Sequence, residues 1–168
     1  MIRVGILGAS GYTGYELVRL LRGHPKGRLV ALSAHSNAGQ HMADLFEGAA
    51  TWGDLPRLER AEALDVAALD VVFCALPHGQ AAETVHELLS LPTPPLVVDL
   101  SNDHRLQDYS DYDGLGGQHP HPETAAKAVY GLSEWHAKAL AKARLIANPG
   151  CYPTSILLPL LPLLRAGL

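Results

Sequence analysis

Apolar and polar positions alternate along the chain in blocks that predict strands and helices in turn. Some short blocks are almost continuously apolar, which is typical of strands buried on both faces. These predicted strands are Ile2–Leu7, Arg28–Leu32, Asp70–Ala75, Leu96–Leu100 and Arg144–Ala147. Between them, apolar residues recur at helical spacing. The predicted helices are Thr13–Leu21, Gly39–Phe46, Gln80–Leu89, Glu134–Ala141 and one beginning at Thr154, which Pro159 and Pro162 should kink or interrupt.

This alternation predicts an α/β fold, a Rossmann-like doubly wound parallel sheet with helices on both faces. In such sheets ligands bind beyond the carboxyl ends of the strands. Polar or glycine-rich residues follow the predicted strands at Gly8–Gly14, Ser33–Asn37, Leu76–Gly79, Ser101–Arg105 and Asn148–Cys151. The longer segment 101–131 is rich in Gly, Pro, Asp and His and has little regular pattern, which is typical of a functional loop or a lid.

The first of these turns contains a G-x-x-G-x-x-G pattern formed by Gly8, Gly11 and Gly14. Glycine lets the backbone turn sharply and approach a pyrophosphate closely, and the following helix N-terminus offers free N–H groups to the anion. Ser10 and Thr13 add hydroxyl donors. The pattern therefore predicts a dinucleotide site, the alternative being a tight strand–helix turn that binds nothing.

The turn after the second strand bears on the choice of dinucleotide. NAD sites usually place a carboxylate there to bind the ribose 2′-hydroxyl. Here the residues are Ser33, Ala34, His35, Ser36 and Asn37, with no acidic side chain to repel a 2′-phosphate. This favours NADP over NAD, unless the segment is only a polar loop.

The composition of the 168 residues is that of a globular protein, with 48% hydrophobic and 18% charged residues. The formal charge of −4 offers no basic excess for nucleic acid, and no basic run or long apolar segment favours a membrane. The N-terminus runs directly into the first predicted strand and does not resemble a secretory signal. With only Cys74 and Cys151, a disulfide scaffold is not expected, so we expect a cytoplasmic protein with reduced thiols.

The two cysteines have different contexts. Cys151 follows a strand and the turn Asn148–Gly150, and it precedes a helix whose N-terminus would stabilise a thiolate. A thiol nucleophile beside a nicotinamide suggests thioester formation coupled to hydride transfer on an acyl group or aldehyde. The alternative for Cys151 is a small buried hydrophobe. Cys74 lies inside an apolar strand, and we predict that it is part of the core.

Five motifs together resemble one enzyme family. They are GASGYTG at 8–14, ALPHG at 75–79, DLSNDHRL at 99–106, AVYGLSE at 128–134 and ANPGCYPTS at 147–155. In this order and spacing they resemble N-acetyl-gamma-glutamyl-phosphate reductase, the NADPH-dependent enzyme of arginine biosynthesis within the semialdehyde dehydrogenase superfamily. Related enzymes act on carrier-bound intermediates of lysine biosynthesis or on aspartyl phosphate, and the sequence does not choose among these substrates.

The resemblance implies a mechanism and a set of site residues. The Cys151 thiolate would attack an acyl-phosphate substrate, phosphate would leave, and the thioester would take hydride from NADPH to give a semialdehyde. Ser101 and Arg105 would bind substrate, although Arg105 could instead form an ion pair with Asp99, Asp103 or Asp108. The cofactor residues implied are Gly8, Ser10, Gly11, Tyr12, Thr13, Gly14, Ser33, His35, Ser36, Leu76, Pro77 and His78.

The chain also departs from the family. The family commonly has Ala and Phe where this chain has Asn102 and His104, so His104 could alter substrate contacts or simply face solvent. The chain has roughly half the family's length, so we expect an NADP-binding domain at 1–147 and only the start of a catalytic domain at 148–168. The catalytic histidine and the surfaces of a homo-oligomer would then lie outside it.

That length leads to further expectations. The isolated chain should be marginally stable, poorly active and prone to self-association through its last helix. A non-catalytic NADP-binding domain with an inert Cys151 is the competing hypothesis. His119 and His121 suggest a metal site, but no cysteine or carboxylate cluster in the sequence completes one, so no metal is predicted.

Overall fold

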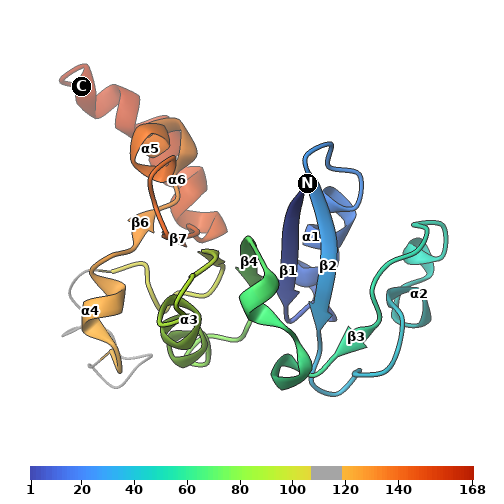
Figure 1. Cartoon of the computed structure of the whole chain (residues 1–168). Coiled ribbons are helices and arrows are strands. Elements are labelled where there is room, and N and C mark those ends of the chain that lie inside the picture. Colours follow the sequence, from blue (N-terminus) through green and yellow to red (C-terminus); the bar gives the residue numbers. More distant parts are fainter. Residues whose placement is uncertain (107–118) are drawn as a thin grey trace.

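A computed structural model describes residues 1–106 and 119–168 of the chain and shows a parallel β-sheet with helices on both faces (Figure 1). The sheet has seven strands in the order β3-β2-β1-β4-β5-β7-β6, and every pair is parallel. The strands are β1 (Ile2–Leu7), β2 (Gly27–Ser33), β3 (Leu58–Glu59), β4 (Val71–Cys74), β5 (Leu96–Asp99), β6 (Val129–Tyr130) and β7 (Leu145–Ala147). The predicted Rossmann-like architecture is confirmed.

The helices agree with the predicted pattern, with a few additions. Short elements that the pattern missed lie between the longer ones: strands β3 and β6, helix α4, and the single-turn 3₁₀-helices η1 (Glu47–Ala49), η2 (Ala61–Ala63) and η3 (Val66–Ala68). The α-helices are α1 (Tyr12–Leu21), α2 (Met42–Leu45), α3 (Ala81–Leu89), α4 (Pro122–Ala125), α5 (Ser133–Leu140) and α6 (Cys151–Arg165). Elements of two to four residues carry too few positions to show a period.

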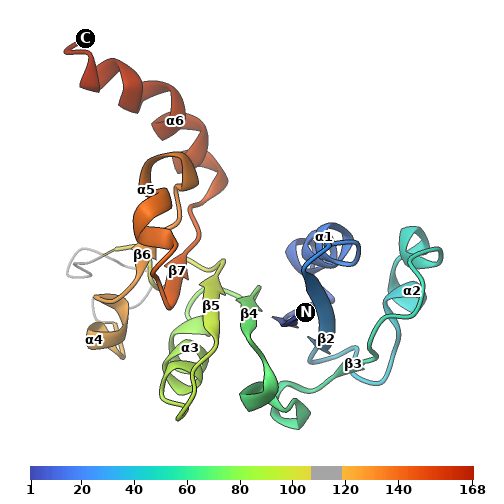
Figure 2. The ribbon, with the colours of Figure 1, turned by 45° about the horizontal axis from the view of Figure 1, so that its top comes forward.

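Alternate residues of the strands build two cores on opposite faces of the sheet, as side-chain alternation requires. On one face, Val4 and Ile6 of β1 pack with Val18 of α1. On the other face, Val72 of β4 packs with Val85 of α3. Figure 2 shows α1 and α3 on opposite sides of the sheet. The rigid framework formed in this way fixes the positions of the turns that follow the strands.

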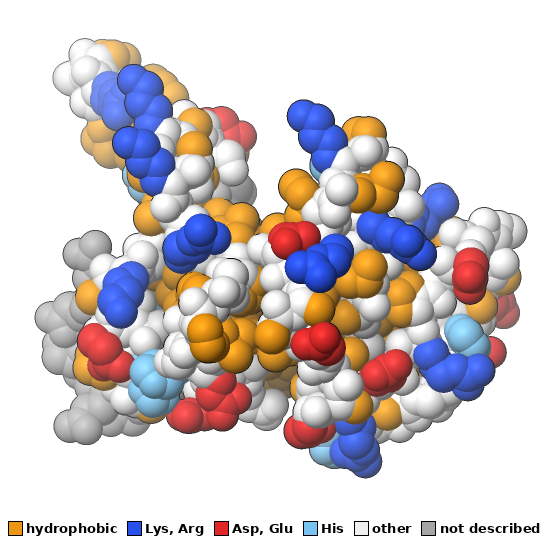
Figure 3. Space-filling view, viewed as in Figure 1, with side chains coloured by type: hydrophobic (Ala, Val, Ile, Leu, Met, Phe, Trp, Pro, Cys, Tyr) orange, Lys and Arg blue, Asp and Glu red, His pale blue; other side chains and the backbone are white. Residues whose placement is uncertain are grey.

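Helix α6 projects away from the sheet (Figures 1 and 2). It runs without interruption from Cys151 to Arg165 with Pro159 and Pro162 inside it. Of the two predicted effects of these prolines, interruption of the helix is therefore wrong, and a kink stays a prediction. The helix packs loosely enough to leave Ile156 and Leu164 with 53% and 64% of their surfaces exposed. Figure 3 shows hydrophobic side chains along this projecting arm. In the described part of the chain, no helix is both long and apolar enough to cross a membrane.

Candidate active site

The carboxyl ends of neighbouring parallel strands bring the predicted site segments to one edge of the sheet. The glycine loop follows β1, and the segment Leu76–Gly79 follows β4, its neighbour. Segment 101–105 follows β5, and the turn before Cys151 follows β7, which pairs with β5. The strand order therefore places a phosphate-binding loop and a candidate nucleophile along the same edge.

The glycine loop depends on two close backbone approaches. Gly8 has a φ of 83°, in the left-handed region, and a Cβ there would collide with the carbonyl oxygen of Ala75. At Gly14, which is buried, a Cβ would collide with the carbonyl oxygen of Gly8. A Cβ at Gly11 would instead have only the Gly8 oxygen nearby, at 3.6 Å. Gly8 thus lets the loop pack against the residue that follows β4, Gly14 lets α1 pack on the loop, and Gly11 leaves open space at the N-cap of α1.

This open space continues into a cavity of about 430 Å³. That volume is within the range of small-molecule and cofactor sites. The predicted cofactor residues that line the cavity are Gly8, Ser10, Gly11, Ser33, His35, Ser36, Leu76 and Pro77. The structure thus brings together side chains that follow β1, β2 and β4.

The other predicted cofactor residues lie outside the lining of this cavity. Tyr12 and Thr13 are exposed on the first turn of α1, and Gly14 is buried against Gly8. His78 is exposed, and its Nδ1 accepts a hydrogen bond from the backbone N–H of Asn102 at 3.0 Å. A role for these residues in cofactor binding remains a prediction.

The cavity also has lining residues that the sequence pattern did not indicate: Arg60, Glu62, Gln80 and Thr84. Arg60 follows β3, whose two residues pair with Leu32 and Ser33 of β2. The backbone N–H of Ala34 donates to the carbonyl of Glu59 at 2.8 Å. Because β3 pairs with β2, Arg60 lies next to segment 34–36. A strand of two residues cannot be recognised from the sequence, so the position of Arg60 just before η2 is the one local signal that it has.

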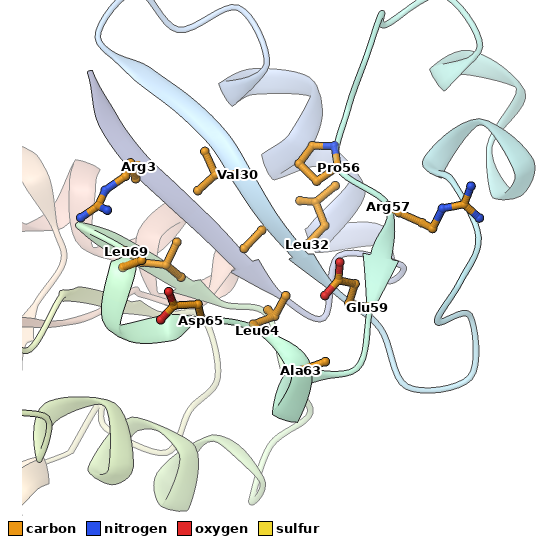
Figure 4. A pocket seen from close by; sticks show the side chains of 12 residues that line it. Arg3, Val30, Leu32, Pro56, Arg57, Glu59, Ala63, Leu64, Asp65 and Leu69 are labelled. Carbon is orange, nitrogen blue, oxygen red and sulfur yellow. The ribbon is translucent and has the colours of Figure 1, made fainter.

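A second hollow, of about 280 Å³, lies beside β2 and β3 (Figure 4). Figure 4 shows Val30 and Leu32 of β2 and Glu59 of β3 around it. Within the described residues, its lining includes none of the predicted cofactor side chains. The cavity at the glycine loop is therefore the better candidate for a dinucleotide.

Ser33 links β2 to the glycine loop. Its hydroxyl oxygen accepts a hydrogen bond from the N–H of Gly8 at 3.2 Å, and its carbonyl accepts one from the N–H of Ala9 at 2.7 Å. The side chain is 3% exposed. Ser33 thus fixes the loop in place from behind, whereas His35 and Ser36 are exposed at the cavity.

Asp103 ties the turn after β5 to the turn after β4. Its carboxylate accepts hydrogen bonds from the N–H groups of Gly79, Ala81 and Ala82 at 2.8, 3.0 and 3.1 Å. The N-cap residue of α3, Gln80, makes no capping bond with its own side chain. Asp103 therefore caps α3 from a distant loop and holds the segment that lines the cavity.

Asp99 organises a buried polar cluster beneath segment 101–105. Its carboxylate accepts hydrogen bonds from the backbone N–H and the hydroxyl of Ser101 at 2.9 and 2.8 Å. It also lies 2.7 Å from Nδ1 of His104, and both of these side chains are 0% exposed. Of the two alternatives for His104, the one in which it faces solvent is wrong. Ser101 is 1% exposed and donates its hydroxyl proton to Asp99, which builds it into the loop, and its role in substrate binding stays a prediction.

Cys151 is the first residue of α6 and is exposed. Gly150 is the N-cap, with extended dihedral angles of −69° and 158°, and its carbonyl accepts hydrogen bonds from the N–H and the hydroxyl of Thr154. The partial positive charge of a helix N-terminus favours an anion at this position. The structure thus presents a reachable sulfur in a place suited to a thiolate.

Arg105 binds the turn that carries Cys151. Its Nε donates to the carbonyl of Asn148 at 2.8 Å, and its Nη2 donates to the carbonyl of Leu100 at 2.9 Å. Its Nη1 would lie 3.0 Å from a Cβ at position 150. These backbone contacts replace the anticipated ion pairs with Asp99 and Asp103, while Asp108 lies outside the described residues. A guanidinium is therefore held beside the turn that carries the candidate nucleophile Cys151.

The remaining sulfur and two of the histidines have other surroundings. Cys74 is 0% exposed in the core of the α3 face, as predicted, and burial raises the pKa of its thiol, with the Asp99 charge adding to the effect. His119 is 6% exposed, and its Nδ1 accepts the N–H of His121 at 3.0 Å. The ring of His121 contacts His86 and Glu83 of α3, which the sequence gave no reason to place beside it.

Comparison with known proteins places this geometry in a family. The model of the family described as semialdehyde dehydrogenase, NAD binding domain, matches residues 3–143. N-acetyl-gamma-glutamyl-phosphate reductase of Rhodospirillum rubrum is 51% identical over 170 residues, which cover 99% of this chain and 48% of that protein. The enzyme of the same name from Afipia carboxidovorans is 50% identical over 167 residues, covering 98% of this chain and 47% of that protein.

Solved structures agree with the fold. Aspartate semialdehyde dehydrogenase II of Vibrio cholerae, complexed with ASA, superposes with a TM-score of 0.68 at 21% identity, covering 99% of this chain and 47% of that one. Aspartate semialdehyde dehydrogenase of Candida albicans with NADP gives a TM-score of 0.64 at 20% identity, with the same coverage. The chain spans about half the length of the curated relatives it matches. With its parallel sheet, its glycine loop and a family match over most of its length, the chain belongs to the NAD-binding domain family of the semialdehyde dehydrogenases.

Proposed function

We propose that this chain is the cofactor-binding and nucleophile-bearing part of an NADPH-dependent reductase that converts N-acetyl-gamma-glutamyl phosphate into N-acetyl-glutamate semialdehyde and phosphate. The observation that carries the proposal is the exposed Cys151 at the N-terminus of α6, on the same sheet edge as the glycine loop. The substrate comes from the relatives, which are about 50% identical and carry that name. A role in arginine biosynthesis follows from that substrate.

The cavity at the glycine loop has the features that a dinucleotide needs. The open space at Gly11 lets a pyrophosphate approach the N-terminus of α1, where the N-cap residue Gly11 supplies no side-chain cap. When bound, the nicotinamide supplies the hydride that reduces the acyl group. Leu76 and Pro77, after β4, would border the nicotinamide end of the cavity, on the side that leads toward β5 and β7.

We propose NADP rather than NAD as the physiological cofactor. The residues that line the cavity after β2 include His35 and Ser36 and no carboxylate, and Arg60 reaches the same cavity from β3. An arginine near the end of the second strand can accept a 2′-phosphate that an acidic residue would repel. The carboxylate of Glu62 also lines the cavity, so the strength of the preference for NADP over NAD depends on how the charges of Arg60 and Glu62 are arranged.

Cys151 would perform the acyl chemistry. Its thiolate attacks the acyl carbon, the bond from that carbon to the phosphate oxygen breaks, and inorganic phosphate leaves with the bonding electrons. After hydride arrives, the resulting hemithioacetal releases the aldehyde and restores the thiolate. Arg105, held beside Gly150, is placed to bind an anionic group of the substrate with two hydrogen bonds.

The first half of this reaction can be tested on the chain alone. Freshly prepared N-acetyl-gamma-glutamyl phosphate should release a burst of about one equivalent of phosphate and leave an acyl adduct on Cys151 that intact-mass spectrometry detects. Cys151→Ser should abolish both, while Cys74→Ser, a change in the core, should leave the adduct in place if the protein still folds. Absence of a burst with wild-type protein that binds NADPH would overturn the assignment of Cys151 as nucleophile.

A second experiment separates the reductase from a non-catalytic NADP-binding domain. Iodoacetamide should alkylate Cys151 faster than it alkylates a free thiol at neutral pH, because the helix N-terminus favours the thiolate. Equal rates, together with tight NADPH binding, would support the non-catalytic alternative. Phosphate-dependent reduction of NADP⁺ with N-acetyl-glutamate semialdehyde would show that the chain completes the whole reaction by itself.

We further propose that the enzyme is cytoplasmic and acts as a homo-oligomer. A catalytic thiol must remain reduced, which the cytoplasm ensures. The exposed apolar face of α6 supplies a surface for a second copy or for the rest of the enzyme.

A further inference from the structure

Four titratable side chains from α3 and from the start of α4 meet outside the cofactor cavity. Glu83 and His86 lie one turn apart on α3, and His121 and Glu123 flank the first residue of α4. The rings of His86 and His121 stack at 3.7 Å between centroids with an angle of 6° between their planes. Neither the candidate active site nor the proposed reaction uses this cluster.

The arrangement concentrates acceptor atoms around one point. Oε1 of Glu123 lies 3.7 Å from Nδ1 of His86 and 3.7 Å from Nδ1 of His121. These distances are too long for hydrogen bonds. One ligand atom from each of the three residues lies within 4.8 Å of the other two. Nitrogen and oxygen ligands at about 2.0–2.2 Å from a four-coordinate zinc ion are separated by somewhat more than 3 Å, so the ligand atoms are already close to the spacing of one coordination shell, and side-chain rotation would complete it.

Each ring has one further hydrogen-bond contact, which bears on where its lone pair lies. Nε2 of His121 is 2.8 Å from Oε2 of Glu83 and donates to that carboxylate, which leaves Nδ1 of the neutral ring with its lone pair. Nδ1 of His86 is 2.9 Å from the hydroxyl of Thr124, which can donate to it. Nδ1 of His121 can therefore offer its lone pair to an ion, whereas Nδ1 of His86 would exchange its contact with the Thr124 hydroxyl for a bond to the ion.

The bond from His121 to Glu83 has a known counterpart in metal sites. A histidine that binds a metal commonly donates its other ring N–H to a carboxylate, which fixes the tautomer and makes the ligand more basic. The side chains of His86 and His121 are only 34% and 19% exposed, so the cluster is partly shielded from water. Two imidazoles and one carboxylate form a ligand set that suits Zn²⁺ and related divalent transition metals rather than Ca²⁺ or Mg²⁺.

We propose that His86, His121 and Glu123 bind a divalent transition-metal ion of the Zn²⁺ class, with Glu83 as the hydrogen-bond partner of His121. A water molecule would complete the coordination, and the two rings would rotate out of their stacked arrangement so that their lone pairs converge on the ion. The ion would fasten α4 to α3. The prediction of no metal rested on the absence of a completing carboxylate, and the fold supplies one from Glu123.

The proposal can be tested independently of the reductase activity. Zn²⁺ is titrated calorimetrically into metal-free Cys151→Ser protein at pH 7.5, because the exposed thiol would otherwise compete for the ion. We expect one equivalent to bind and the melting temperature to rise with added Zn²⁺. Co²⁺ in the same protein should give the visible absorption bands of an ion with nitrogen and oxygen ligands.

Variants identify the ligands. His86→Ala, His121→Ala and Glu123→Gln should each weaken binding at least tenfold, and Glu83→Gln should weaken it by about tenfold to a hundredfold through the loss of its bond to His121. His24→Ala removes an exposed histidine that follows α1 and should leave the affinity for Zn²⁺ unchanged. Circular dichroism confirms that each variant is folded, and the exposed Glu123→Gln is the least disruptive. Absence of Zn²⁺ binding, or binding that survives His121→Ala and Glu123→Gln in folded protein, would overturn the proposal.

Discussion

Replacement of Asp103 by alanine should destabilise the chain more than any change to an exposed carboxylate. The Asp103 side chain is 0% exposed and joins the turn after β5 to the N-terminus of α3. Among its donors in the described part of the chain, Ala81 and Ala82 are buried, whereas Gly79 is exposed and can turn to water. Alanine would therefore leave two buried N–H groups without an acceptor.

The magnitude follows from these donors. Each of the two buried N–H groups costs about 1–3 kcal/mol when it lacks a partner, and because these bonds are themselves the cap of α3, no separate cap loss is added. We expect Asp103→Ala to lower the free energy of unfolding by about 3–5 kcal/mol, a large part of the roughly 5–15 kcal/mol typical of a domain. For a chain of this length the melting temperature would fall by about 10 °C. Asp103→Asn retains one acceptor oxygen and should lose less.

Urea unfolding followed by circular dichroism measures this difference. Asp65→Ala, a change to an exposed carboxylate that makes no side-chain cap at η3, is the matched control and should leave the midpoint almost unchanged. Because Asp103 also holds Gly79 in the turn that lines the cavity, Asp103→Asn should weaken NADPH binding as well. An unfolding free energy of Asp103→Ala within about 1 kcal/mol of the wild-type value would refute this account of the cap.

Three further predictions concern cofactor choice, pH and association. Arg60→Ala should raise the Kd for NADPH by about tenfold or more and that for NADH little, as measured by fluorescence titration, and equal losses would contradict a contact with the 2′-phosphate. Burial lowers the pKa of His119, with the charge of His104 adding to the effect. Near the ordinary histidine pKa of about 6.5 the unfolded chain therefore binds more protons than the folded chain, so the free energy of unfolding should fall as the pH drops below about 6.5. His119→Gln should reduce this pH dependence of the unfolding free energy, measured by urea titrations at several pH values. Sedimentation should show self-association of the wild-type chain that Ile156→Glu with Leu164→Glu abolishes, and a wild-type chain that stays monomeric at high concentration would argue against the apolar face of α6 as its cause.

The longer elements could be predicted because their patterns are local. Ile2–Leu7 was predicted with the bounds that β1 has, and α1 begins one residue before the predicted Thr13. Buried strands and amphipathic helices must show their apolar residues at fixed spacing wherever they lie in the fold. The pattern failed for β3 and β6, which have two residues each and are held by their neighbours in the sheet. It also failed at Pro159, where the helix continues through a residue that usually ends one.

The candidate site was predictable in part for the same reason. A glycine loop between a strand and a helix, and a cysteine after a turn, are contiguous patterns with a direct chemical meaning. The roles of Ser101 and His104 were not, because a serine in a loop has the same local sequence whether it faces a substrate or a buried aspartate. Arg105 shows the same limit, since its bond to the carbonyl of Asn148 spans 43 residues of sequence.

Neighbouring residues encode the class of sheet, the loop that can hold a pyrophosphate and the position of the candidate nucleophile Cys151, so each could be read from the sequence. The tertiary structure alone decided the lateral order of the strands, in which β7 lies between β5 and β6 although β6 comes before it in the chain. That order, and the packing of α4 near α3, bring together Arg60 with Ser36 and His86 with His121. Such contacts depend on how distant segments share one core, and no local period of hydrophobic and polar residues carries that information.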